Sequence, residues 1–180
     1  CRLKAIIAPV CRAMYDFTEY GVRKALADAS HADLVFHAPH PWGDLQGVDR
    51  IYKKLYAPLF QSVPDLERRD LIFVAGSTDE AAHWVGCAGY YSGTFVVPWM
   101  DILPTGHLVH LRFHEFYRFE ADKIVEVQAI WDIPEVMMQA SCWPMVPSLG
   151  RELHVPGPAV QVDAAKAAVD PILTKNSLNL

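Results

Sequence analysis

One segment of the sequence places an acid among apolar side chains. Residues 108–119 alternate, so a strand there puts Glu115 and Tyr117 on the same face as Val109, Leu111, Phe113 and Phe119. The opposite face then holds His110, Arg112, His114, Arg118 and Glu120. Burial disfavours the charged form of a carboxyl group and raises its pKa, which suits a general acid or base working near neutral pH. Glu115 is therefore the first catalytic candidate. The alternative is a structural glutamate that pairs with a buried partner such as an arginine.

Asp132 and His37 are two further candidates for proton transfer. Asp132 stands directly before Ile133 and Pro134, where it either caps a short helix or supplies a second acid. His37 lies in the proline-stiffened segment 36–43, and its imidazole titrates near physiological pH. His40 follows at a spacing that matches no recognisable metal motif, so a structural role is expected for His40 and no metal is expected here.

The cysteines give no sign of a metal cluster or a disulfide framework. Cys1, Cys11, Cys87 and Cys142 are far apart and none of them forms a C-x-x-C pair. Their scattered placement fits a reducing cytoplasm.

Aromatic residues are more numerous than packing alone requires. Most of them are expected in the core, but two or three rings lining a cavity would suit a flat, largely apolar ligand. The predicted ligand contacts are Trp42, Trp84, Tyr90, Trp99 and Tyr117.

Composition limits the class of protein that can position these residues. The 180 residues are 52% hydrophobic and 21% charged, which predicts one folded domain. A net charge of −5 argues against a nucleic-acid or membrane-surface partner. No apolar run is long enough to span a bilayer, and no signal peptide is evident, so a cytoplasmic protein is predicted. The first residue is not Met, so a trimmed or partial chain remains open.

The order of elements predicts an α+β fold. Helical periodicity covers 11–29 and 48–62, and proline begins a short helix over 135–140. Extended segments are predicted at 34–37, 71–75, 82–91, 93–97, 108–119 and 123–131. Helices followed by a run of antiparallel strands favour a helical layer on one sheet, with a pocket between them. The domain is placed at 1–145, followed by a proline-rich strap or linker over 146–180 with a short helix at 163–173.

The second half of this pattern resembles a known family. Its motifs are PTGH at 104–107, HEFYRF at 114–119, KIVE at 123–126 and WDIP at 131–134, and the match is clearest over 98–145. In this order they resemble the SnoaL-like polyketide cyclases, which share the fold of nuclear transport factor 2 and ketosteroid isomerase. The resemblance implies a cone: a strongly curved antiparallel sheet whose concave side is covered by helices and encloses a pocket.

The resemblance also implies a catalytic acid and a histidine that this chain lacks at the corresponding positions. Characterised cyclases of the family close a polyketide ring by an intramolecular aldol condensation, without metal or nucleotide cofactor. Their acid lies three residues after the glutamate of the KIxE motif, which is Ala129 here, and their histidine falls on Glu115. The resemblance further implies a homodimer formed through the outer sheet face. By analogy with ketosteroid isomerase, Tyr90 would donate a hydrogen bond to an enolate oxygen.

Two functions from different classes follow. The first is a cofactor-free enzyme that moves a proton next to a carbonyl group, in aldol-type cyclisation, isomerisation or dehydration. Glu115 would be its base, assisted by His37 or Asp132. The second is a non-catalytic module that binds a small molecule or a partner, which the alanine at position 129 favours. A third interpretation makes the chain half of a tandem protein, because 155–158 resembles linkers between such domains.

Overall fold

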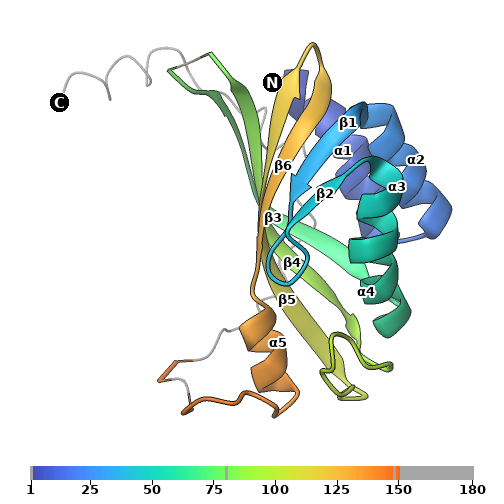
Figure 1. Cartoon of the computed structure of the whole chain (residues 1–180), viewed down its shortest axis with the longest axis vertical. Helices are drawn as coiled ribbons and strands as arrows, with labels where there is room; N and C mark the ends of the chain where they lie inside the picture. The colour runs from blue at the N-terminus through green and yellow to red at the C-terminus, as the bar shows by residue number, and fades with distance from the viewer. Residues whose placement is uncertain (1, 80, 148, 151–180) are drawn as a thin grey trace.

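A single sheet, covered by helices on one face, forms the body of the protein (Figure 1). The computed structural model describes residues 2–79, 81–147 and 149–150. The strands run in the order β2-β1-β6-β5-β4-β3. Their bounds are β1 Ser30–His37, β2 Asp44–Gln46, β3 Glu67–Ser77, β4 His83–Thr94, β5 Leu108–Glu120 and β6 Lys123–Trp131. The helical elements are α1 Arg2–Tyr15, α2 Glu19–Ala29, α3 Val48–Ile51, the π-helical turn η1 Tyr52–Tyr56, α4 Ala57–Ser62 and α5 Ile133–Gln139.

The sheet is mixed, which corrects the expectation of a wholly antiparallel one. β3 to β6 pair as successive antiparallel neighbours, but β1 pairs with β6 in parallel. β1 enters the sheet from α2, so no hairpin with β6 sets its direction. The predicted α+β class holds, since α1 to α4 cover one face of the sheet and the described part of the chain places no helix over the other face (Figure 1).

The first predicted helix is two helices. Over 11–29 the apolar spacing is continuous, yet the chain breaks after Tyr15 and restarts at Glu19. The Thr18 side chain accepts a hydrogen bond from the Gly21 amide at 3.1 Å and caps the second helix. The predicted helix over 48–62 is present as three contiguous elements, α3, η1 and α4, and Pro58 follows directly after the π-helical turn.

The strands are longer than the sequence pattern indicated. The segments predicted at 82–91 and 93–97 belong mostly to one strand, β4, and β3 begins at Glu67 rather than at residue 71. The burial of β5 alternates as predicted. Of the predicted strap, residues from 151 on, including its helix over 163–173, lie outside the described residues.

A bulge in β3 decides which side chains enter the interior. The register between β3 and β4 shifts between Asp70 and Ile72, and both Arg68 and Asp70 point to the buried face. Gly89 lies opposite, where an added Cβ would come within 1.8 Å of the Arg69 carbonyl oxygen. The bulge therefore requires glycine at this position.

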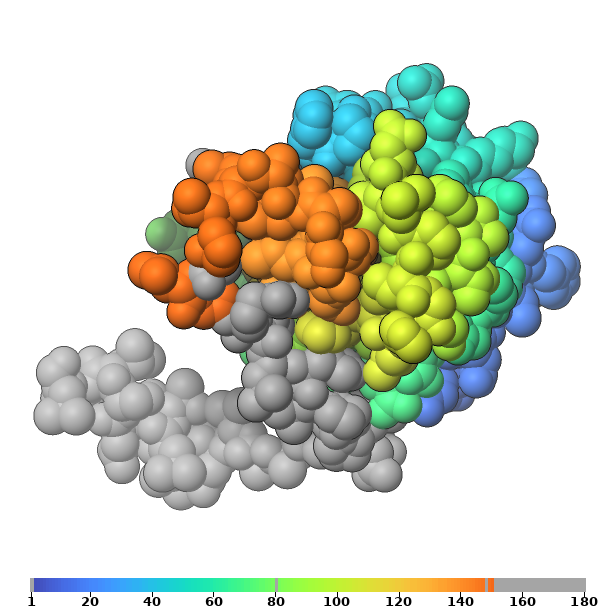
Figure 2. All heavy atoms as spheres, turned by 90° about the horizontal axis from the view of Figure 1, so that it is seen from below, coloured from blue at the N-terminus to red at the C-terminus, as the bar shows by residue number. Residues whose placement is uncertain are grey.

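The lower end of the molecule is closed by α5 and the loop over 95–107 (Figures 1 and 2). Met100 and Asp101 both have positive φ, at 50° and 64°, in a tight turn closed by the bridge between Trp99 and Ile102. None of the described helices is long and apolar enough to cross a membrane.

Candidate functional site

Glu115 lies in the interior with no exposed surface and receives four hydrogen bonds. Its Oε2 accepts from Arg68 Nη1 at 2.7 Å and from the Tyr117 hydroxyl at 2.5 Å. Its Oε1 accepts from Trp131 Nε1 at 2.9 Å and from the Tyr91 hydroxyl at 3.1 Å. A carboxylate offers about four lone-pair positions, so every acceptor position of Glu115 is occupied.

Arg68 connects Glu115 to a second acid. It is 1% exposed, and its Nε and Nη2 donate to Asp70 Oδ1 at 3.0 and 2.8 Å. The guanidinium also lies over the Phe113 ring, 4.2 Å from its centroid. Burial opposes the charge of Arg68, but Asp70, the neighbouring tyrosines and Glu115 outweigh it and hold the pKa of Arg68 well above its ordinary value. We call this group the buried polar cluster: Arg68, Asp70, Tyr91, Glu115, Tyr117 and Trp131.

The tyrosines of the cluster act as donors. Burial raises the pKa of both Tyr91 and Tyr117 well above the ordinary value, and the charge of Glu115 adds to the effect. Both phenols therefore stay protonated at neutral pH and donate to the carboxylate. Because all acceptor positions of Glu115 are filled by its neighbours, a substrate proton would have to displace one of four donors.

Glu115 stands directly across from the position where the family resemblance implies an acid. In the pairing of β5 with β6, Glu115 lies opposite Ala129, which is 8% exposed. The interior acid of this chain is thus one strand away from the expected position.

Asp132 caps a helix. Its side chain accepts a hydrogen bond from the Glu135 amide at 3.2 Å at the start of α5. This is the structural role that the sequence left open for it.

His37 does not join Glu115 in the interior. Near the end of β1, Leu34 and Phe36 are buried, and the half-buried His37 points the other way. Its Nδ1 lies 2.7 Å from Asp44 Oδ1 and its Nε2 lies 3.5 Å from Glu126 Oε1. The three candidate catalytic residues are therefore not brought together.

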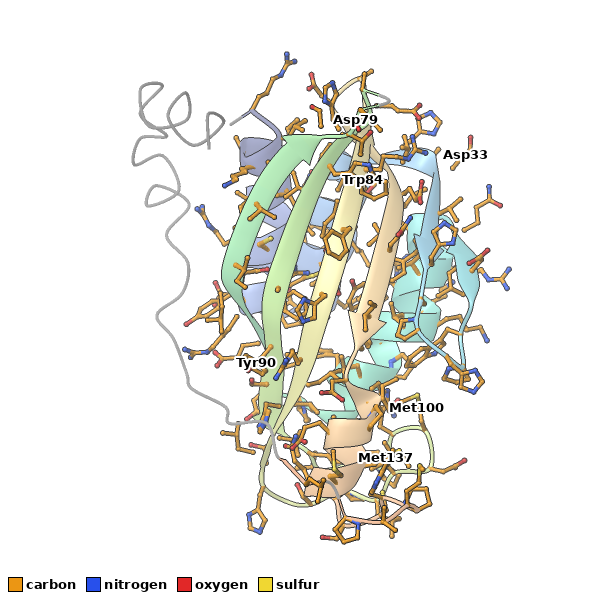
Figure 3. The ribbon with its side chains drawn as sticks, turned by 90° about the vertical axis from the view of Figure 1, so that its left-hand side faces the viewer. Asp33, Asp79, Trp84, Tyr90, Met100 and Met137 are labelled. Carbon is orange, nitrogen blue, oxygen red and sulfur yellow. The ribbon has the colours of Figure 1, made fainter. Side chains whose placement is uncertain are left out.

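Trp84 and Tyr90 point away from the helices, although Tyr90 is only 7% exposed. Figure 3 looks onto the helix-free face of the sheet and shows both on that face. They alternate along β4 with Val85 and Tyr91, which face the helices. Tyr90 packs edge-on against His110 with 5.8 Å between ring centroids. Neither residue can be a wall of a pocket beneath the helices.

Trp42, Trp99 and Tyr117, in contrast, lie on the side of the interior. Trp42 is half-buried and its ring centroid is 5.9 Å from those of both Trp99 and Trp131. Trp99 is 3% exposed, and its Nε1 has no hydrogen-bond partner among the described residues.

A small pocket lies beside Trp99 at the lower end of the molecule. Its cavity volume is about 10 Å³, which is room for about one water molecule. We call it the lower pocket; it is lined by Leu59, Ser62, Val63, Leu66, Tyr91, Ser92, Gly93, Phe95, Trp99, Val109, Leu111 and Val136. Its wall is largely apolar, and Tyr91 alone belongs both to this wall and to the buried polar cluster.

Sequence reasoning missed Arg68 and Asp70. A buried arginine was expected as a possible partner for Glu115, but no residue was assigned because β3 was predicted to start at residue 71. The signal was the alternation of Leu66, Arg68 and Asp70, all of which are buried.

Comparison with known proteins supports one family. Residues 8–140 match the model of a family described as SnoaL-like polyketide cyclase. No curated protein sequence matches at a significant level. Among solved structures, AclR from Streptomyces galilaeus superimposes with a TM-score of 0.63 at 20% identity, covering 79% of this chain and 97% of that one.

Three further structures show the same fold. A SnoaL-like polyketide cyclase from Agrobacterium tumefaciens has a TM-score of 0.57 at 21% identity over 76% of this chain and 96% of its own. TerC, crystallised with polyporic acid, has a TM-score of 0.58 at 14% identity over 78% of this chain and 99% of its own. A structure of an NTF2-like protein from Burkholderia pseudomallei is also similar, at 15% identity and a TM-score of 0.58 over 77% of this chain and 96% of its own.

Proposed function

This chain belongs to the SnoaL-like polyketide cyclase family, and from that premise we propose that it binds a flat, largely apolar, carbonyl-bearing small molecule without acid–base turnover. The observation that carries the proposal is the state of Glu115, whose acceptor positions are all filled by neighbouring donors. Asp132 caps α5 and His37 lies on the other face of the sheet, so neither replaces the acid missing at Ala129.

The lower pocket is the proposed binding site. Its apolar wall favours an apolar ligand, and the buried Trp99 Nε1 offers a hydrogen bond to a carbonyl oxygen, since it has no partner among the described residues. The pocket must widen to admit such a ligand, and the loop over 95–107 is the segment whose displacement would do so. TerC, which was crystallised with polyporic acid, supports a small-molecule ligand for this fold.

A thermal-shift screen of flat aromatic carbonyl compounds tests the proposal. Hits should stabilise the wild-type protein and should be recovered unchanged by mass spectrometry. Trp99→Phe removes the donor and should weaken binding about tenfold, the equivalent of one lost hydrogen bond. Trp84→Phe, on the outer face, is the matched control and should bind like the wild type. If no compound stabilises the protein, or if both variants behave alike, the assignment of the lower pocket is wrong.

Acid–base catalysis through Glu115 is the second candidate function. The observation that favours it is the place of Glu115 opposite Ala129, in hydrogen-bond contact with Tyr117. If a hit is converted by the wild type, and a folded Glu115→Gln variant binds that hit without converting it, Glu115 is catalytic and the binding-only proposal fails.

We also propose that a second copy of the chain covers the helix-free face of the sheet. Four apolar side chains are exposed there on β3, β5 and β6: Ile72 (54%), Val74 (55%), Phe116 (43%) and Ile130 (67%). Ion pairs of Arg118 with Glu120 and Glu126 border this patch, so a two-fold arrangement could set the cation of one copy against the acids of the other.

Light scattering after gel filtration tests the dimer. The wild type should have the mass of two chains, and Phe116→Glu should have the mass of one. Leu103→Glu places the same charge at a residue that is 67% exposed outside the sheet, and should leave the mass unchanged. A monomeric wild type, or a dimer that survives Phe116→Glu, contradicts this interface.

A further inference from the structure

Three potential metal ligands meet between the first helix and the sheet. Cys11 comes from α1, Asp70 from β3 and Cys87 from β4, and one ligand atom of each lies within 4.8 Å of the others. Cys87 is 2% exposed and Asp70 is 8% exposed, whereas Cys11 is half-buried. We propose that this group is a binding site for a thiophilic divalent cation of the Zn²⁺ class, with both sulfurs and one Asp70 oxygen as ligands.

The ligand chemistry suits such a cation. Zn²⁺ binds cysteine sulfur and carboxylate oxygen, commonly in tetrahedral sites. Binding would form two metal–sulfur bonds, break two S–H bonds and release two protons to solvent, with no change of oxidation state. Three protein ligands would leave the fourth tetrahedral position to water.

Arg68 prepares Asp70 for this role. Its Nε and Nη2 both donate to Asp70 Oδ1, at 3.0 and 2.8 Å, while Oδ2 receives one bond, from Nε at 3.1 Å. Hydrogen bonds of this kind orient ligating carboxylates in metal sites. Oδ2 keeps capacity for a further partner.

A cation would also offset most of the local negative charge. Two thiolates and the Asp70 carboxylate carry three negative charges, of which a divalent cation neutralises two, and the nearest further positive charge is Arg68, which Asp70 shares with Glu115. Without a cation, a second thiolate in this buried place would be strongly disfavoured. The ligands lie far apart in sequence and come from three elements, which is why no cysteine spacing indicated the site.

The test uses the full reduced chain with Cys1 and Cys142 both replaced by serine, so that Cys11 and Cys87 are the remaining thiols. Cd²⁺ serves as the probe, because its bonds to thiolate absorb in the near ultraviolet. We expect one Cd²⁺ per chain, and competition by Zn²⁺ should abolish the absorption band.

Variants assign the ligands. Adding Cys11→Ser or Cys87→Ser should abolish the band, with circular dichroism showing that each variant is folded. Asp70→Asn should keep the band and weaken the affinity by about tenfold or more. Restoring Cys142 should change neither the stoichiometry nor the affinity.

A second readout does not depend on the folding of core variants. In the wild type, Zn²⁺ should slow alkylation of Cys11 while leaving that of the exposed Cys142 unchanged. The proposal is overturned if Cd²⁺ produces no band, if the band survives Cys11→Ser, or if Zn²⁺ protects neither cysteine or both equally.

Discussion

The buried polar cluster and the lower pocket are neighbours in one interior, yet they differ in how many hydrogen-bonding groups and how much space they leave for a ligand. In the cluster, the acceptor positions of Glu115 are all filled from its own chain, and Arg68 donates to both Glu115 and Asp70. The lower pocket has space and an apolar wall, and one of its lining residues, Trp99, has an Nε1 without a hydrogen-bond partner among the described residues. The ionisable side chains of the interior are therefore bound to one another, whereas the apolar residues that line the lower pocket are available to a ligand.

This difference argues against a catalytic role for the interior acid, Glu115. A buried carboxylate commonly indicates catalysis, because burial perturbs its proton affinity. Here the compensating guanidinium and three neutral donors surround Glu115, and its role depends on whether any of them can be displaced. Stability measurements on the two regions distinguish a structural cluster from a catalytic one.

Arg68→Met should have the largest effect. It leaves Asp70 and Glu115 buried without their cation, and breaking a buried pair in this way costs about 4 kcal/mol of unfolding free energy. Urea denaturation measures the loss. Arg118→Met is the control: Arg118 pairs with Glu120 and Glu126 on the outer face, and its loss should cost under about 1 kcal/mol.

A triple variant tests whether the loss of stability in Arg68→Met comes from the unpaired acids. Replacing Asp70 and Glu115 by their amides together with Arg68→Met removes all three charges, so part of the lost stability should return. If Arg68→Met is as stable as the wild type, the cluster is not structural and Glu115 regains its place as a catalytic candidate.

Gly89→Ala should destabilise the protein nearly as much, because its side chain would collide with the bulge in β3 beside Arg68 and Asp70. The added Cβ would meet the Arg69 carbonyl oxygen at 1.8 Å, and relief requires movement of the β3 backbone. We expect a loss of about 3 kcal/mol in urea denaturation. Gly76→Ala is the matched control, since its Cβ would meet nothing within 4 Å. Equal stability of the two variants would show that β3 shifts without cost.

Much of this architecture was readable from the sequence. The alternation along β5 predicted which of its residues are buried, and the order of helices and strands predicted the α+β class, because both signals are local periodicities. The break at Thr18 was missed because the apolar spacing runs through it, and the cap bond to Gly21 competes with that pattern.

The candidate site was predicted less completely. Glu115, Tyr117 and Trp99 were placed in the interior, but His37, Trp84 and Tyr90 were not separated from them. The face of a strand residue depends on register against its neighbours, and the burial of β1 alternates only over its last four residues. Arg68 was missed because the strand was predicted to begin only at residue 71. The bulge after Asp70 reverses the alternation at that point, so the pattern of 71–75 does not continue back to Arg68.

Leu111→Ala tests the lower pocket. It removes a wall residue that is 3% exposed, and because the pocket already deprives that wall of contacts, we expect a loss of about 2 kcal/mol, at the low end for such a truncation. The enlarged pocket should bind thermal-shift hits more tightly. Leu103→Ala, at a residue 67% exposed, should change neither quantity. A variant that loses stability and gains no affinity would place the ligand elsewhere.

Asp132 gives the smallest effect and separates its two roles most cleanly. Asp132→Ala removes the cap of α5, so unfolding free energy should fall by about 1 kcal/mol. Asp132→Asn keeps an oxygen that can accept the bond from the Glu135 amide, and should lose only a few tenths of a kcal/mol. The asparagine variant has no acid to exchange a proton, yet it should bind every hit like the wild type. A hit that the wild type converts and Asp132→Asn does not would make Asp132 an acid of the site. Asp132 would then act on the ligand as well as cap α5, which contradicts a purely structural role.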